Sequence, residues 1–320
     1  MSVLTAPAPP RRGRAPGGLR GAVRRRPLLS FFVLALGASW VAWLPYILSN
    51  NGLGVWDFTF PGGLAGGQLL GMLLGAYLGP IGAALTVTAL TDGRAGLRAW
   101  ARRLWNWRVS WVWYVGILLS VPGAMILSGL VFSGGDVRMP PVAALVSLVP
   151  GLLVQMVTTG LAEEPGWRDF ALPRMQRRIG PLGASLAIGV LWGVWHLPLF
   201  LTQWGEYPDA SVVRIAAFVG FCMLFNIVMT WVFNRTGQSL PMAMLLHVSL
   251  NNFSGVWAEM FPWWDTEAFQ LILLAGSAGA AVVVLAATRG RLGLDPTRPG
   301  GEPVVQRPDV VRPPEEARLS

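Results

Sequence analysis

The chain has 320 residues, of which 53% are hydrophobic and only 13% are charged, whereas a soluble domain carries about 25% charged residues. This composition excludes an ordinary soluble enzyme and predicts a membrane protein with several spans. The net charge of +9 comes from arginines clustered between apolar runs, which argues against nucleic acid as a partner. The single cysteine, Cys222, excludes an internal disulfide and any cysteine-based metal site.

Eight apolar segments are each near the ~20 residues that a helix needs to cross ~30 Å of hydrocarbon. A spanning backbone must satisfy its own polar groups, so each segment is predicted to be helical. The predicted spans are 28–49, 66–90, 110–132, 141–164, 182–203, 211–233, 239–257 and 267–288. The predicted fold class is therefore all-α, a polytopic membrane helix bundle of about eight transmembrane helices over residues 27–291. The Pro- and Arg-rich tails, 1–26 and 292–320, are expected to be disordered.

The arginines predict the orientation of these spans. The N-terminal tail, segments 91–109 and 165–180, and the residues after the last span are rich in arginine, and the intervening loops are poor in it. Positive charge is retained on the cytoplasmic side of a bilayer. We therefore expect a multi-pass plasma-membrane protein with both termini in the cytoplasm.

Two segments at the start of the bundle carry packing and surface signals. In the second span, glycines recur every four residues from Gly63 to Gly79, which places them on one helix face and allows close approach of another helix. Segment 94–107 combines leucine and tryptophan with five arginines close by, which predicts an interfacial helix on anionic headgroups.

The candidate chemistry lies in the second half of the chain. An acid pair, Glu163-Glu164, ends the fourth span, and Arg168 follows Glu164 by four residues, so those two can pair on one helix face. Glu163 points about 100° away and stays free to act as a base. Taken alone, this motif also fits an ordinary acid pair at the membrane surface.

The only two histidines of the chain, His196 and His247, both lie within apolar spans. Ionisable groups at membrane depth cost roughly 2.5–3.5 kcal/mol each, so they usually have a function. Trp192 lies on the same helix face as His196. Asn251 lies on the same helix face as His247, and the side chains of Asn251 and His247 can both donate hydrogen bonds to a developing oxyanion. Taken singly, a core histidine bonded to a backbone carbonyl and an interhelical polar clamp fit equally well.

In order and spacing, these motifs resemble the CPBP family of CAAX proteases and bacteriocin-processing enzymes, also called the Abi or type II CAAX prenyl endopeptidase family. The family pattern is E-E-x-x-x-R, F-x-x-x-H and H-x-x-x-N/D on successive membrane helices. The chain has EEPGWR at 163–168, WGVWH at 192–196, with tryptophan in place of phenylalanine, and HVSLN at 247–251. The resemblance covers roughly residues 140–260.

The resemblance implies an intramembrane endopeptidase whose substrates are membrane-associated or lipidated peptides or proteins, in CAAX-type processing or in bacteriocin maturation and immunity. The implied catalytic residues are Glu163, Glu164, Arg168, His196, His247 and Asn251. Glu163 and His196 would activate water, and His247 and Asn251 would bind the oxyanion. Glu164 and Arg168 would support this geometry.

The resemblance leaves the cofactor open, because the family is commonly described as metalloproteases while a metal-free glutamate mechanism has also been argued. Glu163, His196 and His247 could together ligate zinc, or one glutamate and one histidine could polarise water unaided. For these residues to meet, segment 165–180 must be mostly helical. The active site is then expected in a cavity among spans four, five and seven that opens to the cytoplasmic side.

Two other functions fit the same residues. A buried network of glutamate, histidine and arginine is also what a proton-coupled transporter would use, although the first half of the chain shows no inverted repeat of the motifs. A catalytically idle membrane protein for immunity or interaction would keep the fold of the family without its activity.

Overall fold

The computed structural model describes residues 18–294, and the regular elements in that range are all helices, which confirms the all-α prediction. Three of them lie wholly outside the predicted spans, namely α1 (Gly18–Arg25), α5 (Gly93–Leu104) and η3 (Pro165–Ala171). The first three spans correspond to α2 (Pro27–Leu48), to the continuous helix α3 (Gly63–Ala76), η1 (Tyr77–Ile81) and α4 (Gly82–Thr91), and to α6 (Trp111–Ser133).

The fourth and fifth predicted spans form one continuous helical run of 60 residues, Val142–Leu201. Its parts are α7 (Val142–Val146), α8 (Leu148–Gln155), η2 (Met156–Gly160), α9 (Leu161–Glu164), η3 (Pro165–Ala171), α10 (Leu172–His196) and η4 (Leu197–Leu201). After the short η5 (Gln203–Gly205) come α11 (Val212–Arg235), α12 (Leu240–Met260) and α13 (Thr266–Thr288).

Among the described residues, six helices are long and apolar enough to cross a membrane. The run Val142–Leu201 counts as one of these six but contains two of the predicted spans. The seventh predicted span, α12, is outside the six, and it carries His247, Asn251 and Asn252. All eight predicted segments are helical in the structure, so the polytopic bundle stands.

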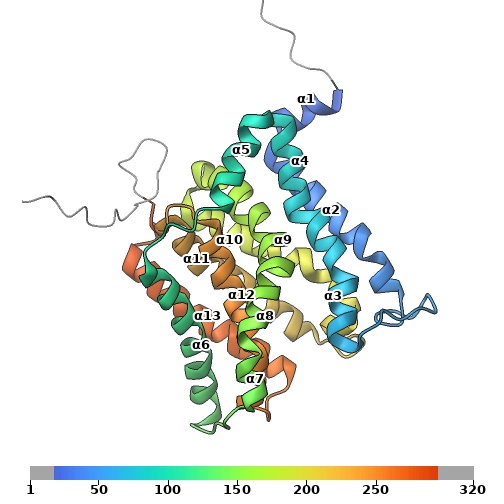
Figure 1. Cartoon of the computed structure of the whole chain (residues 1–320), viewed down its shortest axis with the longest axis vertical. Coiled ribbons are helices and arrows are strands. Elements are labelled where there is room, and N and C mark those ends of the chain that lie inside the picture. Colours follow the sequence, from blue (N-terminus) through green and yellow to red (C-terminus); the bar gives the residue numbers. More distant parts are fainter. Residues whose placement is uncertain (1–17, 295–320) are drawn as a thin grey trace, which may run out of the picture.

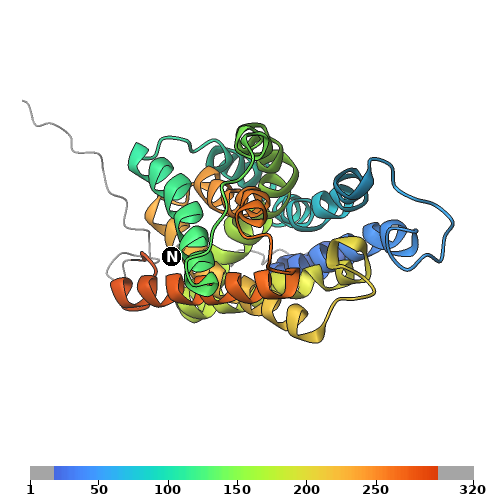
Figure 2. The same ribbon diagram turned by 90° about the horizontal axis from the view of Figure 1, so that it is seen from below.

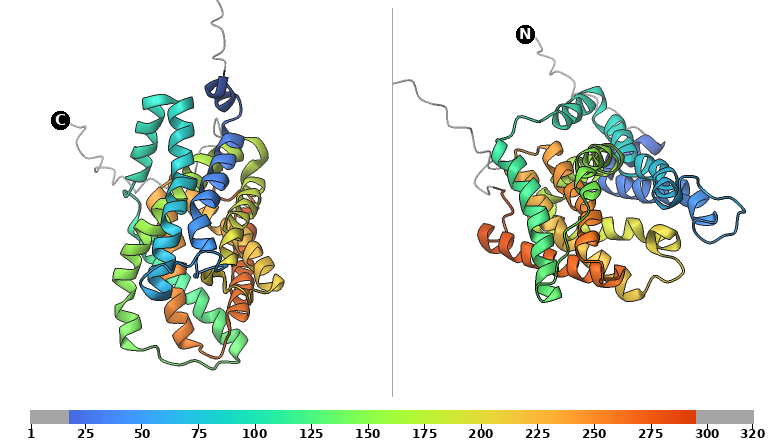
Figure 3. Two further views of the ribbon diagram at one scale, coloured as in Figure 1. Left: turned by 90° about the vertical axis from the view of Figure 1, so that its right-hand side faces the viewer. Right: turned by 60° about the horizontal axis from the view of Figure 1, so that its bottom comes forward.

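The helices are arranged around α12. Seen from below, α2 and α3 lie on one side of α12, and α6 and α13 lie on the other (Figure 2). With the long axis vertical, α1 and α5 lie at the top and α7 at the bottom (Figures 1 and 3). We call the top the Arg-rich end. We call the bottom, with the connections 49–62, 134–141, 202–211 and 261–265, the Arg-poor end.

The glycine face of α3 packs against α2, as predicted. A Cβ atom on Gly71 would overlap the Tyr46 ring, and one on Gly75 would overlap the Trp43 ring. The close approach also allows a polar contact, in which the Ser39 hydroxyl donates to the carbonyl of Gly75 at 2.7 Å. Small residues are therefore needed here for the two helices to touch.

The predicted tails are too long at both inner boundaries. Residues Gly18–Arg25 form α1, and Arg24 Nε donates to the carbonyl of Leu90 at 3.0 Å. Leu292 is fully buried, and its carbonyl accepts from Asn234 Nδ2 at 2.8 Å. The rest of the predicted disorder, 1–17 and 295–320, lies outside the described residues.

Segment 94–107, predicted to be an interfacial helix, mostly forms α5, which has no buried residue. The helix projects at the Arg-rich end of the molecule (Figure 3). It is tied to the long helical run by Arg103, whose Nη2 donates to Asp169 Oδ2 at 3.0 Å. A surface helix with this contact is consistent with the amphipathic pattern that the sequence shows.

Candidate active site

The acid pair lies in α9, between two π-helical turns, η2 and η3. Such turns widen a helix locally and are frequent at functional sites. Pro165 begins η3, and proline lacks the N–H group that a regular α-helical turn would use at this point. The chain then stays helical up to Gly180, whose φ of 72° produces a kink in α10. The prediction that segment 165–180 is mostly helical is confirmed.

Glu164 and Arg168 form the predicted ion pair, with 3.1 Å between Arg168 Nε and Glu164 Oε2. Both side chains are completely buried. The guanidinium also lies 5.6 Å from the centre of the Trp192 ring, and its Nη2 donates to Met229 Sδ at 2.9 Å. A buried charge requires such compensation, which these contacts give to the Arg168 guanidinium.

Glu163 forms no ion pair with any described residue, which leaves it free of Arg168 as predicted. Its Oε2 accepts a hydrogen bond of 2.7 Å from the indole Nε1 of Trp192. The sequence predicted only that Trp192 lies on the same face as His196. In the structure, the backbone carbonyl of Trp192 contacts His196, so Trp192 positions both the carboxylate and the imidazole.

His196 lies at the end of α10 with Nδ1 2.8 Å from the carbonyl oxygen of Trp192. A carbonyl can only accept, so Nδ1 carries the hydrogen and Nε2 keeps a free lone pair. The ring is enclosed by aromatic side chains that the sequence analysis did not single out. Trp204 stacks on it with 5.6 Å between ring centres, and Trp195 and Phe218 pack edge-on.

His247 contacts Glu164 across 83 residues of sequence, with 2.8 Å between Nδ1 and Glu164 Oε1. The sequence analysis did not foresee this contact, since no short-range pattern relates α9 to α12. His247 Nε2 lies 3.4 Å from Nδ2 of Asn251, as their spacing of four on one face predicts. The chain of contacts thus runs from Arg168 through Glu164 and His247 to Asn251.

A cavity of about 620 Å³ joins these groups. Its lining includes Glu163, His196, His247 and Asn251, together with Trp192. The structure therefore brings four of the predicted residues to one cavity wall, and it places the Glu164–Arg168 pair behind them. A cavity is therefore present among the fourth, fifth and seventh predicted spans, where the site is expected.

The lining of this cavity extends toward the Arg-poor end of the bundle. Its lining includes Ala65, Arg214 and Thr266, which lie in the first turns of α3, α11 and α13 at the Arg-poor end. Within residues 18–294, none of its lining comes from the Arg-rich segments 91–109 and 165–180. The residues of η3, which lie next to Glu163 in the chain, are all buried. The side of the membrane to which the cavity opens stays a prediction.

The residues proposed as zinc ligands line one cavity but do not form a compact cluster among the described residues. Within the described part of the chain, no three His, Cys, Asp or Glu side chains lie close enough together to hold a metal ion. Nδ1 of His247 contacts Glu164, and Nδ1 of His196 contacts a backbone carbonyl, so only Nε2 of each ring remains to contact a ligand. Glu163, His196 and His247 share a cavity, but they do not converge on one point.

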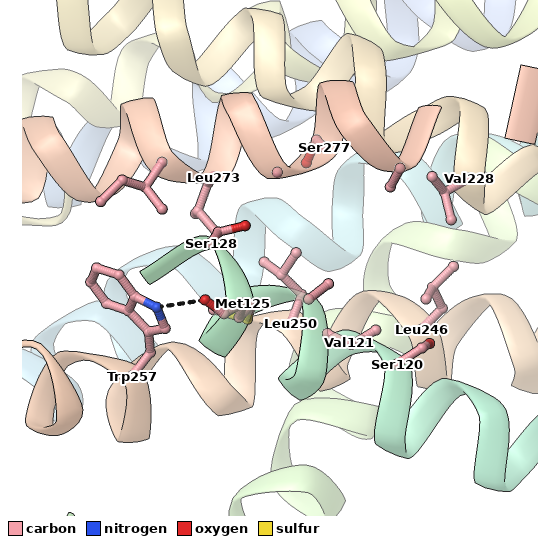
Figure 4. Close-up of a pocket in the computed structure, with 14 residues that line it drawn as sticks. Ser120, Val121, Met125, Ser128, Val228, Leu246, Leu250, Trp257, Leu273 and Ser277 are labelled. Carbon is pink, nitrogen blue, oxygen red and sulfur yellow. Dashed lines mark hydrogen bonds between the residues drawn. The ribbon is translucent and has the colours of Figure 1, made fainter. Parts of the chain in front are cut away.

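A second, smaller cavity of about 170 Å³ lies between α6, α11, α12 and α13 (Figure 4). Its lining is mostly aliphatic, and at one side Trp257 Nε1 donates to the carbonyl of Met125 at 3.0 Å. It shares Leu250 and Leu273 with the larger cavity. It contains none of the predicted catalytic residues, four of which line the larger cavity.

Comparison with known proteins shows what the part of the chain that carries this site is similar to. Residues 145–253 match the family described as type II CAAX prenyl endopeptidase Rce1-like, and this range contains all six predicted site residues. Over 140 residues the chain is 29% identical to CAAX prenyl protease 2 of Methanococcus maripaludis. The aligned region covers 43% of this chain and 49% of that protein. The chain thus spans about half the length of the curated relative it matches.

Proposed function

We propose, on the premise that residues 145–253 belong to the Rce1-like family of type II CAAX prenyl endopeptidases, that this protein is an intramembrane endopeptidase. Its substrates are membrane-associated peptides or proteins, which include lipidated ones. The observation that carries the proposal is the shared support by Trp192, which holds Glu163 through its indole and His196 through its carbonyl. Both side chains then face one cavity with His247 and Asn251.

Glu163 is the general base in this proposal. The Trp192 indole occupies Oε2, so Oε1 remains to take a proton from water in the cavity. The free Nε2 of His196 accepts the second hydrogen of that water and orients its lone pair toward the substrate carbonyl carbon. The protonated Glu163 then returns its proton to the leaving amine, so protons balance over one turnover.

His247 and Asn251 stabilise the oxyanion of the tetrahedral intermediate in this proposal. With Nε2 protonated, the His247 ring donates a hydrogen bond beside the one from Asn251 Nδ2, and the two nitrogens are 3.4 Å apart. The carboxylate of Glu164 at Nδ1 favours the positively charged ring. Arg168 holds the Glu164 side chain in place behind the cavity.

The mechanism proceeds without a metal ion because the donor atoms do not converge on one. Zinc content per purified protein, measured for the wild type and for His247→Ala, tests this point together with activity after chelation. We expect chelation to leave cleavage unchanged. Stoichiometric zinc that disappears with His247→Ala would replace this mechanism with a metal-assisted one.

The decisive experiment compares peptides in membrane fractions from cells that produce the wild type or Glu163→Gln. The glutamine keeps the size and the hydrogen bond to Trp192 but cannot take a proton, so we expect cleavage to fall by at least ~10²-fold. Membrane insertion, checked by the amount of protein in the membrane fraction, should be normal. Full activity of Glu163→Gln beside an inactive but folded Glu164→Gln would reverse the assigned roles.

A further inference from the structure

We propose that Arg214 and Gln270 form a subsite of the 620 Å³ cavity that binds a carboxylate group of the peptide substrate and so selects which peptides are cleaved. This inference rests on the proposed function and adds a specificity determinant to it. It follows from the position of both side chains in the cavity wall, from the hydrogen-bond donors that they leave free, and from the aromatic contacts that join Arg214 to His196.

Arg214 brings a positive charge into the wall of the cavity. It lies in the first turn of α11, and it lines the same cavity as Glu163 and His247. Within the described residues, it is the only lining residue with a permanent positive charge. Its side chain is only 12% exposed. An arginine so placed is suited to contact a substrate that occupies the cavity.

A short chain of aromatic rings joins this arginine to His196. The Arg214 guanidinium lies 5.7 Å from the centre of the Phe200 ring, and Phe200 packs edge-on against Trp204 at 5.4 Å. Trp204 stacks on His196 with 5.6 Å between ring centres. These steps place the guanidinium at most about 17 Å from the imidazole, a distance that about five extended peptide residues span. One peptide can therefore contact both groups.

The guanidinium keeps free donors. Its Nη1 contacts Glu206 at 3.1 Å and donates to the carbonyl of Gly205. Nε and Nη2 donate to no residue within 18–294. These two nitrogens form one edge of the guanidinium, the arrangement that binds a carboxylate through two parallel hydrogen bonds. Glu206 is 42% exposed and lies outside the cavity lining, so it leaves this edge open to a ligand.

Gln270 adds a buried donor to the same wall. Its side chain is only 8% exposed, and Nε2 has no hydrogen-bond acceptor among residues 18–294. It follows Thr266 by four residues on α13, so the two share a helix face, and both line the cavity. The Thr266 hydroxyl donates at 2.5 Å to the Glu206 carboxylate that Arg214 also contacts. This face of α13 therefore lies beside Arg214.

The chemistry of these free groups indicates the ligand. All of them are donors, and one carries a positive charge, so the ligand must accept hydrogen bonds and be negatively charged. A carboxylate has two acceptor oxygens and meets both demands, whereas a backbone carbonyl has no charge to match the guanidinium. A peptide carries a carboxylate at its C-terminus and on aspartate or glutamate side chains, so the test must separate these two sources.

The probe is a synthetic peptide whose cleavage distinguishes wild-type membranes from Glu163→Gln membranes. It is made with a free C-terminus, with a C-terminal amide, and with each Asp or Glu replaced by Asn or Gln. kcat and KM are measured in detergent micelles for the wild type, Arg214→Gln, Arg214→Lys and Gln270→Leu. Arg138→Gln is the control, because Arg138 is exposed over the Trp263 ring and lies outside the cavity lining.

We expect the wild type to cleave the probe with kcat/KM ~10–100-fold above the form that lacks the recognised carboxylate, the range for hydrogen bonds to a charged group. The form that is cleaved poorly identifies the source of that carboxylate. Arg214→Gln should cleave both forms equally slowly, mainly through a higher KM, and Arg214→Lys should recover part of the preference. Gln270→Leu should raise KM by ~3–10-fold, as for a neutral hydrogen bond. Arg138→Gln should match the wild type.

Glu206→Gln separates binding from a structural role of the ion pair. It breaks the same pair as Arg214→Gln but leaves the guanidinium, so it should keep or strengthen the preference for the carboxylate. Loss of that preference in Glu206→Gln would overturn the proposal, because the pair would then act only by shaping the cavity.

Two further outcomes would overturn the subsite while leaving the proposed function intact. In the first, the wild type cleaves all three forms of the probe alike, a comparison that needs no variant. In the second, Arg214→Gln keeps a normal melting temperature and the full preference. If no peptide in the membrane fraction depends on Glu163, the proposed function fails, and the subsite fails with it.

Discussion

Replacing Glu164 by glutamine tests the buried ion pair on which the site is built. The change removes the charge that faces Arg168 Nε at 3.1 Å, while the amide oxygen still accepts from Nδ1 of His247. Both members of the pair are completely buried, and breaking such a pair costs about 3–5 kcal/mol because one charge is left uncompensated. At about 2 °C per kcal/mol, the low end of the range for larger domains, the melting temperature should fall by roughly 6–10 °C.

The assay is thermal unfolding of the purified protein in detergent micelles. It compares Glu164→Gln, Arg168→Met and the double variant with the wild type. The double variant leaves no uncompensated charge, so it should be more stable than the sum of the two single losses predicts. Glu206→Gln is the matched control, because the Glu206–Arg214 pair is partly exposed and such pairs contribute about 0–1 kcal/mol.

The reasoning would be refuted by additive losses, within about 0.5 kcal/mol, for Glu164→Gln and Arg168→Met. It would equally be refuted if the Glu206→Gln control lowered the melting temperature as much as Glu164→Gln. Either result would mean that the buried contact of Glu164 with Arg168 contributes little to stability. The Glu164–Arg168 pair would then not be what holds His247 in position.

Two further predictions concern the oxyanion groups and the packing of α2 against α3. Asn251→Ala and His247→Ala should each lower kcat by ~10²–10³-fold, as for loss of one oxyanion donor. KM should change little, because the oxyanion exists only in the transition state. A rise in KM alone would assign these residues to substrate binding. Gly75→Ala should lower the melting temperature, because the added Cβ atom would overlap the Trp43 ring. Gly123→Ala is the control, because its Cβ atom would have nothing within 4 Å, and it should leave the melting temperature unchanged or raise it. Equal effects of the two changes would contradict the close packing of α2 against α3.

The sequence by itself determined the features that depend on neighbours along one helix. Apolar length located the helices, since crossing hydrocarbon demands about 20 apolar residues. The spacing of four predicted the contact of Glu164 with Arg168 and the approach of His247 to Asn251, because 3.6 residues per turn place such residues on one face. The spacing of the glycines likewise predicted a face for close packing.

The tertiary structure decided which helices face one another and at what height. The contact of Glu164 with His247 joins residues 83 positions apart, and the hydrogen bond from Trp192 to Glu163 depends on how α9 and α10 are rotated. Such rotations result from the packing of many side chains at once, which no single periodicity encodes. The extent of the cavity was decided in the same way, because its lining comes from several helices while the residues of η3 beside Glu163 are all buried.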